Sequence, residues 1–238
     1  MTNLKRLRIR LIRASNLPIF FDDLLCPEIP LKRRIFYLYI RFQYLKDYCE
    51  YLLAGHKNKR KKVPHMIKRK IIKKYANKYK LQTFVESGTY LGDMVSALSR
   101  EFKKIFSIEL FWPLYFKAYL RFKYMRHIKI YNGDSGKKLK EILKDLDRPS
   151  LFWLDAHYSG EGTGQGKIDS PIINEIKTIF KSRQKNVILI DDANDFNGKK
   201  GYPKIEYFKT FIKKNKLKYN IYKNKNIIIL EPLNNEAN

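Results

Sequence analysis

The chain has 238 residues, 44% of them hydrophobic, which is long enough for one substantial domain with an appendage. Two cysteines, Cys26 and Cys49, have no neighbouring ligand set, so neither a disulfide framework nor a structural zinc site is indicated, and a reducing, cytoplasmic setting fits. No apolar run reaches the roughly 18 residues that span a bilayer, and no signal-peptide cleavage pattern follows residue 1. Neither a membrane-spanning nor an exported protein is therefore expected.

The net charge of +27 is unevenly distributed along the chain. Residues 1–80 hold 22 Lys and Arg against 5 Asp and Glu, whereas the remainder holds 28 against 18. Such an excess attracts polyanions, whether nucleic acid, anionic lipid headgroups or charged glycan carriers. An ordinary solvated basic surface is the alternative interpretation.

Residues 1–80 are predicted to form a basic, mostly helical extension. Prolines break the segment 16–30 into turns. Apolar residues recur at helical spacing from Leu31 to Leu45 and from Ile67 to Tyr79, on either side of the polar loop 56–65. We expect the apolar faces of these two helices to pack on the main domain, which would comprise residues 81–238.

From residue 81, short β-rich runs alternate with helical patterns, which is typical of a parallel sheet with crossover helices. The expected strands are 83–87, 104–110, 128–134, 150–156 and 186–192, and the expected helices are 94–102, 113–122, 137–146, 171–180 and 205–214. Residues 219–230 then predict a β-hairpin joined by Lys223, Asn224 and Lys225. One carboxyl-terminal strand should therefore be antiparallel to the rest.

Acidic residues lie at the ends of the five expected strands. They are Glu86, Glu109, Asp134, Asp155, Asp191 and Asp192. Because the carboxyl ends of parallel strands form the ligand-binding edge of such a sheet, these acids predict one polar site. Each acid taken singly is also a common helix cap or turn residue.

The turn after the first expected strand, residues 86–92, contains Gly88 and Gly92 in a G-x-x-x-G spacing. This differs from the G-x-G-x-x-G turn that cradles a dinucleotide, so NAD binding is disfavoured. Glu109 follows Gly88 by 21 residues, where a carboxylate accepts hydrogen bonds from both ribose hydroxyls. The sequence thus favours an adenosyl ligand.

With its terminal hairpin, this pattern resembles class I S-adenosylmethionine-dependent methyltransferases. The resemblance implies a Rossmann-like three-layer sandwich around a mostly parallel seven-stranded sheet. It also implies that S-adenosylmethionine is held by residues of the glycine turn and of the next two strand ends: Glu86, Gly88, Thr89, Gly92, Glu109, Asp134 and Ser135. Within this set, Asp134 would bond the adenine amino group.

Residues 153–160 and 189–195 resemble the metal site of macrocin-type sugar O-methyltransferases. That resemblance implies that Asp155, Asp191 and Asp192 bind Mg²⁺ or another hard divalent cation. His157 is the expected base beside Asp155, because neutral imidazole accepts a proton near physiological pH.

The glycine-rich segment 159–171 is long for a strand-to-helix connection and would serve as a lid over the acceptor. An ordinary surface loop is the alternative. Tyr158, Ser159 and Tyr202 are candidate acceptor contacts.

Residues 82–200 also resemble bacterial proteins of surface-polysaccharide modification. The expected function is methyl transfer to a sugar or glycan hydroxyl, with a lipid-linked acceptor and contact between the basic helices and an anionic inner leaflet. Three alternatives stay open: an RNA methyltransferase that uses the basic region, a noncatalytic scaffold, and a metal-dependent glycosyltransferase. Nucleic acid ranks below the glycan as a partner.

Overall fold

The computed structural model describes residues 63–155, 171–182, 184–199 and 201–233, with isolated positions 42, 46 and 49. The chain forms two compact units, Met1–Lys70 and Ile71–Asn238, and the division falls inside helix α4 (His65–Lys78). In the first unit, Phe42, Lys46 and Cys49 are helical. The predicted helix from Leu31 to Leu45 otherwise lies outside the described residues, whereas the predicted helix from Ile67 to Tyr79 is confirmed as α4.

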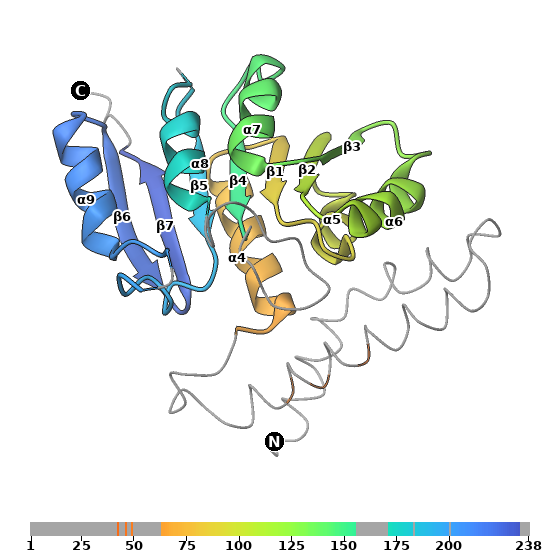
Figure 1. Ribbon diagram of the computed structural model, residues 1–238, viewed down its shortest axis with the longest axis horizontal. Helices are drawn as coiled ribbons and strands as arrows, with labels where there is room; N and C mark the ends of the chain where they lie inside the picture. Colours follow the sequence, from red (N-terminus) through yellow and green to blue (C-terminus); the bar gives the residue numbers. More distant parts are fainter. Residues whose placement is uncertain are drawn as a thin grey trace. The chain divides into compact units, whose positions relative to one another are not determined.

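The second unit is built on one seven-stranded sheet (Figure 1). Its strands are β1 (Thr83–Ser87), β2 (Lys104–Glu109), β3 (Ile128–Asn132), β4 (Leu151–Leu154), β5 (Val187–Ile190), β6 (Tyr219–Asn224) and β7 (Ile227–Pro232). They lie in the order β3-β2-β1-β4-β5-β7-β6, with β1 to β5 parallel and β7 antiparallel to both of its neighbours. This confirms the predicted mostly parallel sheet with a carboxyl-terminal hairpin.

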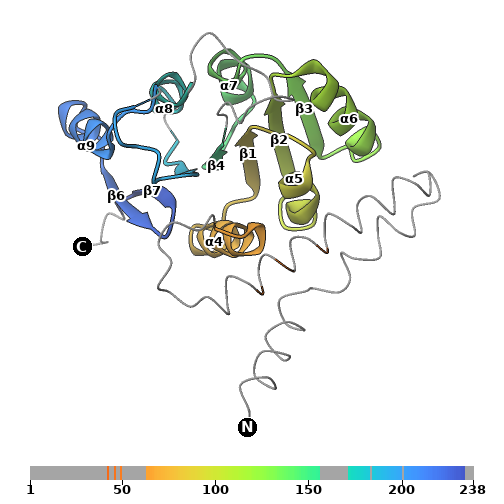
Figure 2. The same cartoon turned by 60° about the horizontal axis from the view of Figure 1, so that its bottom comes forward.

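A helix follows each of the five parallel strands, as the alternation predicts. These helices are α5 (Asp93–Leu98), α6 (Trp112–Phe122), α7 (Ser135–Lys144), α8 (Ile172–Ile179) and α9 (Ile205–Lys214). Helices α7, α8 and α9 cover one face of the sheet, and α5 and α6 lie together on the other (Figures 1 and 2). In the described part of the chain, no helix is long and apolar enough to cross a bilayer.

The hydrophobic core explains why the central strands are almost uninterruptedly apolar. Every residue of β1, β4, β5 and β7 is buried, as expected for strands covered on both faces. Towards α7, α8 and α9, residues such as Val85, Phe152, Ile188 and Phe208 form one buried cluster. Burial on both faces sets the register, because a shift by one residue would exchange the faces of every side chain.

Parallel register brings the strand ends into line. Ser87, the last residue of β1, is paired with Ile108 of β2 and with Leu154 of β4, and Leu154 is paired with Ile190 of β5. The residues that follow these ends therefore share one edge of the sheet. Because β7 runs the other way, the hairpin turn returns to this edge as well.

The hairpin turn differs from the prediction. Strand β6 continues through Lys223 and Asn224, which pair with Ile228 and Ile227, and the turn consists of Lys225 and Asn226. Lys225 has the left-handed backbone conformation (φ 57°) that a two-residue hairpin loop requires. The predicted loop from Lys223 to Lys225 was therefore wrong by two residues at its amino end and by one, Asn226, at its carboxyl end, because polar residues on an edge strand resemble a turn.

The carboxyl half of α4 is anchored on the hairpin by a polar cluster. The Tyr222 hydroxyl lies 2.6 Å from that of Tyr75 and donates to Glu231 Oε1 at 2.9 Å. Lys78 Nζ and the Tyr79 hydroxyl donate to Glu231 Oε2 at 2.6 and 2.8 Å. Edge strand β6 is thus held to the body of the domain.

Candidate functional site

The turn after β1 is fixed by its backbone. The amides of Gly88 and Thr89 both donate to the carbonyl of Ile108, at 3.0 and 3.2 Å. Gly88 and Gly92 are left-handed, with φ of 89° and 77°. A Cβ on Gly92 would lie 2.6 Å from Phe122 Cε2, so this glycine also permits the close approach of α6.

Glu86 begins a buried chain of hydrogen bonds beneath this turn. Ser107 Oγ donates to Glu86 Oε2 at 2.6 Å and lies 2.6 Å from Thr89 Oγ1. Burial raises the pKa of Glu86 well above its ordinary value, and the Ser107 hydroxyl lowers it in part. The sequence prediction missed Ser107, whose only signal is a hydroxyl in an otherwise apolar run.

Glu109 is the last residue of β2, and its side chain contacts the backbone of the glycine turn. Its Oε2 accepts from the amide of Tyr90 and its Oε1 from the amide of Phe111, both at 2.8 Å. Burial raises the pKa of Glu109, and these backbone amides lower it in part. Each carboxylate oxygen keeps a second lone pair, so the side chain can still accept from two ribose hydroxyls.

Asp134 has a structural role at the end of β3. It is the N-cap of α7, where Oδ1 accepts from the amide of Lys137 at 3.0 Å. Its other carboxylate oxygen is not used by this cap, and the residue is exposed. Ser135 begins the helix and is buried.

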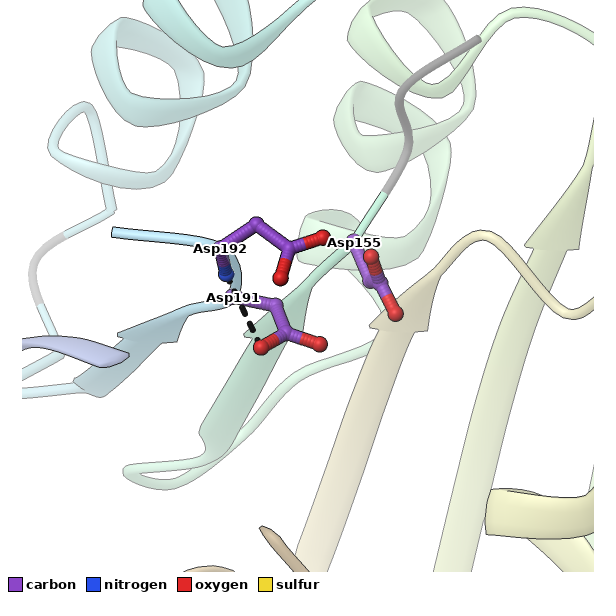
Figure 3. A group of neighbouring side chains, drawn as sticks. All are labelled: Asp155, Asp191 and Asp192. Atoms are coloured by element: carbon purple, nitrogen blue, oxygen red, sulfur yellow. Dashed lines mark hydrogen bonds between the residues drawn. The ribbon is translucent and has the colours of Figure 1, made fainter. Parts of the chain in front are cut away.

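The three aspartates after β4 and β5 lie together, as predicted (Figure 3). Each of Asp155, Asp191 and Asp192 offers a carboxylate oxygen within 4.8 Å of the other two. The amide of Asp155 donates to Ser87 O and that of Asp191 to Leu154 O, both at 3.0 Å, so the strands extend their pairing into the site. Oxygen ligands alone suit a hard divalent cation, and a cation relieves the repulsion between such close carboxylates.

Asn226 of the hairpin turn holds the Asp191–Asp192 corner. Asp192 is left-handed (φ 49°), and its amide donates to Asp191 Oδ1 at 2.9 Å. Asn226 Nδ2 donates to Asp192 Oδ1 at 3.0 Å, and Asn226 Oδ1 accepts from the amide of Asn194 at 2.7 Å. The sequence prediction missed this residue, because only the fold brings the hairpin turn to this edge.

Glu175 of α8 is a second residue that the sequence prediction missed. Its side chain is 1% exposed and lies beside the hydroxyls of Ser135 and Ser87. Burial raises the pKa of Glu175 to about 7, the two hydroxyls lower it in part, and the charges of Asp134 and Asp155 have a smaller raising effect. Its position in an amphipathic helix gave no sign of a buried acid beneath the site.

The remaining candidates are not tested by the described structure. His157, Tyr158 and Ser159 lie outside the described residues, as does most of the expected lid 159–171. Tyr202 packs edge-on against Phe196, with ring centroids 5.3 Å apart, at the border of the core. Its contact with an acceptor stays a prediction.

Comparison with solved structures finds methyltransferases. An O-methyltransferase from Bacillus cereus bound to SAH is 12% identical, with a TM-score of 0.53 over 94% of this chain and 99% of that one. TomG, an O-methyltransferase from Streptomyces achromogenes bound to SAM, is 16% identical, with a TM-score of 0.52 over 72% and 81%. The SAH-bound methyltransferase PaMTH1 from Podospora anserina is 14% identical, with a TM-score of 0.51 over 80% and 86%.

No protein-family model matches the sequence, and no curated protein matches it either. The likeness is therefore one of fold. The second unit has the Rossmann-like methyltransferase fold, as the sequence resemblance predicted.

Proposed function

We propose that this protein is an S-adenosylmethionine-dependent O-methyltransferase. The observation that carries the proposal is Glu109, held at the end of β2 by the amides of Tyr90 and Phe111 beside a left-handed glycine turn. A buried carboxylate in this place suits the ribose hydroxyls of an adenosyl group. The SAM-bound and SAH-bound proteins of the same fold support the choice of cofactor.

A divalent cation, Mg²⁺ or a similar ion, would be held by Asp155, Asp191 and Asp192. The all-oxygen donor set fits such an ion, and Asn226 fixes one of the three carboxylates. When bound, the cation orients an acceptor hydroxyl and lowers its pKa. His157, two residues after Asp155, is the proposed base.

The proposed acceptor is a sugar or glycan hydroxyl, carried on a lipid, at the cytoplasmic face of a membrane. The support is the sequence resemblance of residues 82–200 together with the basic charge of residues 1–80. The basic charge of residues 1–80 would serve no purpose for a neutral, freely diffusing glycan, whereas it would attract the anionic membrane that carries a lipid-linked one.

Calorimetric titration with S-adenosylmethionine tests the cofactor site. Native protein should bind it, and Glu109→Gln, which keeps the shape of the side chain, should bind at least roughly tenfold more weakly because two charge-assisted hydrogen bonds are lost. Glu206→Gln, an exposed change on α9, is the control and should bind normally. Binding of a nucleotide sugar in place of S-adenosylmethionine would instead establish the glycosyltransferase alternative.

Titration with Mg²⁺ tests the aspartate cluster separately. Asp191→Asn should abolish Mg²⁺ binding while S-adenosylmethionine binding persists. Asp195→Asn, an exposed change in the same loop, should leave both unchanged. Equal Mg²⁺ binding by the native protein and Asp191→Asn would remove the cation from the proposal.

A further inference from the structure

Helix α6 is apolar on two faces. Leu114, Ala118 and Phe122 are buried against the sheet at a spacing of four residues. Trp112, Phe116 and Tyr119 recur at helical spacing on the exposed side. A helix at the surface of a water-soluble domain normally carries polar residues there, so this second apolar face implies a partner.

The exposed rings form a clustered surface, which we call the α6 aromatic face and define as Trp112, Phe116 and Tyr119. The rings of Trp112 and Phe116 stack with centroids 5.2 Å apart and an interplanar angle of 6°. Among the described residues, six of the ten exposed large hydrophobic side chains fall between positions 110 and 124, so the exposure is concentrated and not scattered.

The charged side chains of residues 110–133 have one sign. Residues 110–133 contain five Lys and Arg and no Asp or Glu. Arg121 pairs with Asp93 at 2.9 Å, whereas Lys117, Lys123, Arg126 and Lys129 are exposed. The partner of the aromatic face must therefore tolerate a concentration of positive charge.

We propose that the α6 aromatic face docks on an anionic lipid surface. Trp and Tyr favour the boundary between headgroups and acyl chains, and the neighbouring Lys and Arg attract anionic headgroups. Two basic copies of this chain would repel each other at this face, and the amino-terminal 80 residues, with 22 Lys and Arg against 5 acids, carry the same sign. Nucleic acid fits less well, because Trp112 and Phe116 stack on each other and offer bases fewer free ring faces.

Docking would also place the proposed adenosyl site, at the carboxyl edge of the sheet, near the lipid. Only Leu110 and Phe111 separate Glu109 from Trp112, so the amino end of α6 adjoins the proposed adenosyl site. This consequence rests on the proposed function, whereas lipid binding itself does not.

The two tryptophans make a direct test possible in the full chain. Trp112 is 59% exposed and Trp153 is 1% exposed, so a change in the polarity around tryptophan on docking arises at Trp112. With vesicles of equal parts phosphatidylglycerol and phosphatidylcholine at low ionic strength, we expect a blue shift of emission and protection from acrylamide. Trp112→Phe, which keeps an aromatic ring, should lose the shift. Pure phosphatidylcholine vesicles should not produce it.

Reversing the charge of Lys117 tests the role of the basic residues beside the α6 aromatic face. Lys117→Glu should weaken vesicle binding roughly 30-fold, the factor for two elementary charges at an anionic surface. Lys209→Glu, an exposed change in the middle of α9, makes the same change of net charge and should weaken binding much less.

Three results would overturn the proposal. The first is vesicle binding by the full chain without a change at Trp112, which would locate the lipid contact elsewhere. The second is protection of Trp112 from acrylamide before any lipid is added, which would mean that this chain or a second copy already covers the face. The third is protection by RNA but not by vesicles. Cofactor titration of the same sample keeps any of these results distinct from failure of the proposed function.

Discussion

Two independent constraints require glycine at position 92. The backbone is left-handed (φ 77°), and the Phe122 ring occupies the position that a Cβ would take. At Gly198, φ is 86°, but there a Cβ would meet only the methylene groups of Lys204, at 3.3 Å. The two glycines therefore share backbone conformation and differ in the rigidity of what lies against them.

We predict that Gly92→Ala lowers the free energy of unfolding by roughly 2 kcal/mol or more, since a left-handed alanine costs about 1–2 kcal/mol before any clash. Gly198→Ala is the matched control and should cost only the conformational part. Urea denaturation of both variants measures the difference. If the two variants lose equal free energy of unfolding, the Phe122 ring moves aside at no energetic cost, which would contradict the prediction.

Glu175 makes stability depend on pH. Its folded pKa, about 7, lies above the ordinary value of 4.5, so the folded state binds its proton more tightly than the unfolded state. The contribution to stability is therefore complete below pH 4.5 and is lost as pH rises through 7.

We predict that Glu175→Gln, which stays neutral, removes this loss. Relative to the native protein, the variant should gain stability between acidic and neutral pH, by at most roughly 3 kcal/mol. Denaturation at several pH values in chelator-containing buffer measures the gain, with the exposed Glu206→Gln as control. A gain that does not change with pH would contradict the prediction.

At the scale of elements, alternation and composition were enough to predict the five strand and helix units. Strands β1, β4 and β5 are buried throughout, and each of the five parallel strands ends within two residues of its predicted acid, because register aligns these ends. The insertion of β7 between β5 and β6 has no sequence signature. For this reason Asn226 could not be predicted as part of the site, and the buried position of Glu175 depends on helix packing in the same way.

The hairpin turn is predicted to control cation affinity. Asn226→Ala removes the hydrogen bond to Asp192 and the acceptor for the amide of Asn194, so Mg²⁺ affinity should fall roughly 10- to 100-fold. Asn220→Ala, on β6 and away from the turn, is the control. Mg²⁺ titration measures both variants. Unchanged affinity in Asn226→Ala would mean that the Asp191–Asp192 corner holds its own shape.

For the whole molecule, 50 Lys and Arg against 23 Asp and Glu mean that like charges repel throughout the chain. Salt screens this repulsion within about 8 Å at physiological ionic strength. The surface ion pairs, such as that of Lys138 with Glu141, are too exposed to offset it.

We therefore predict that sodium chloride raises the thermal unfolding midpoint by a few degrees, since ~1 kcal/mol corresponds to about 2–4 °C at this size. Circular dichroism at low and high salt measures the shift. Sodium sulfate at matched ionic strength is the comparison, and a larger effect there would reveal specific anion binding. A midpoint that falls with sodium chloride would contradict net repulsion.

The place of Asn226 in the chain has a consequence for synthesis. A ribosome delivers Asp155, Asp191 and Asp192 well before the hairpin emerges, so a nascent chain carries the three acids before it carries the residue that braces Asp192. Strand β7 must then enter the sheet beside β5, and only this late pairing brings the turn to the aspartates. Assembly of the site is thereby tied to a step that follows synthesis of the three aspartates, and a chain that stops before the hairpin would lack the final shape of the site.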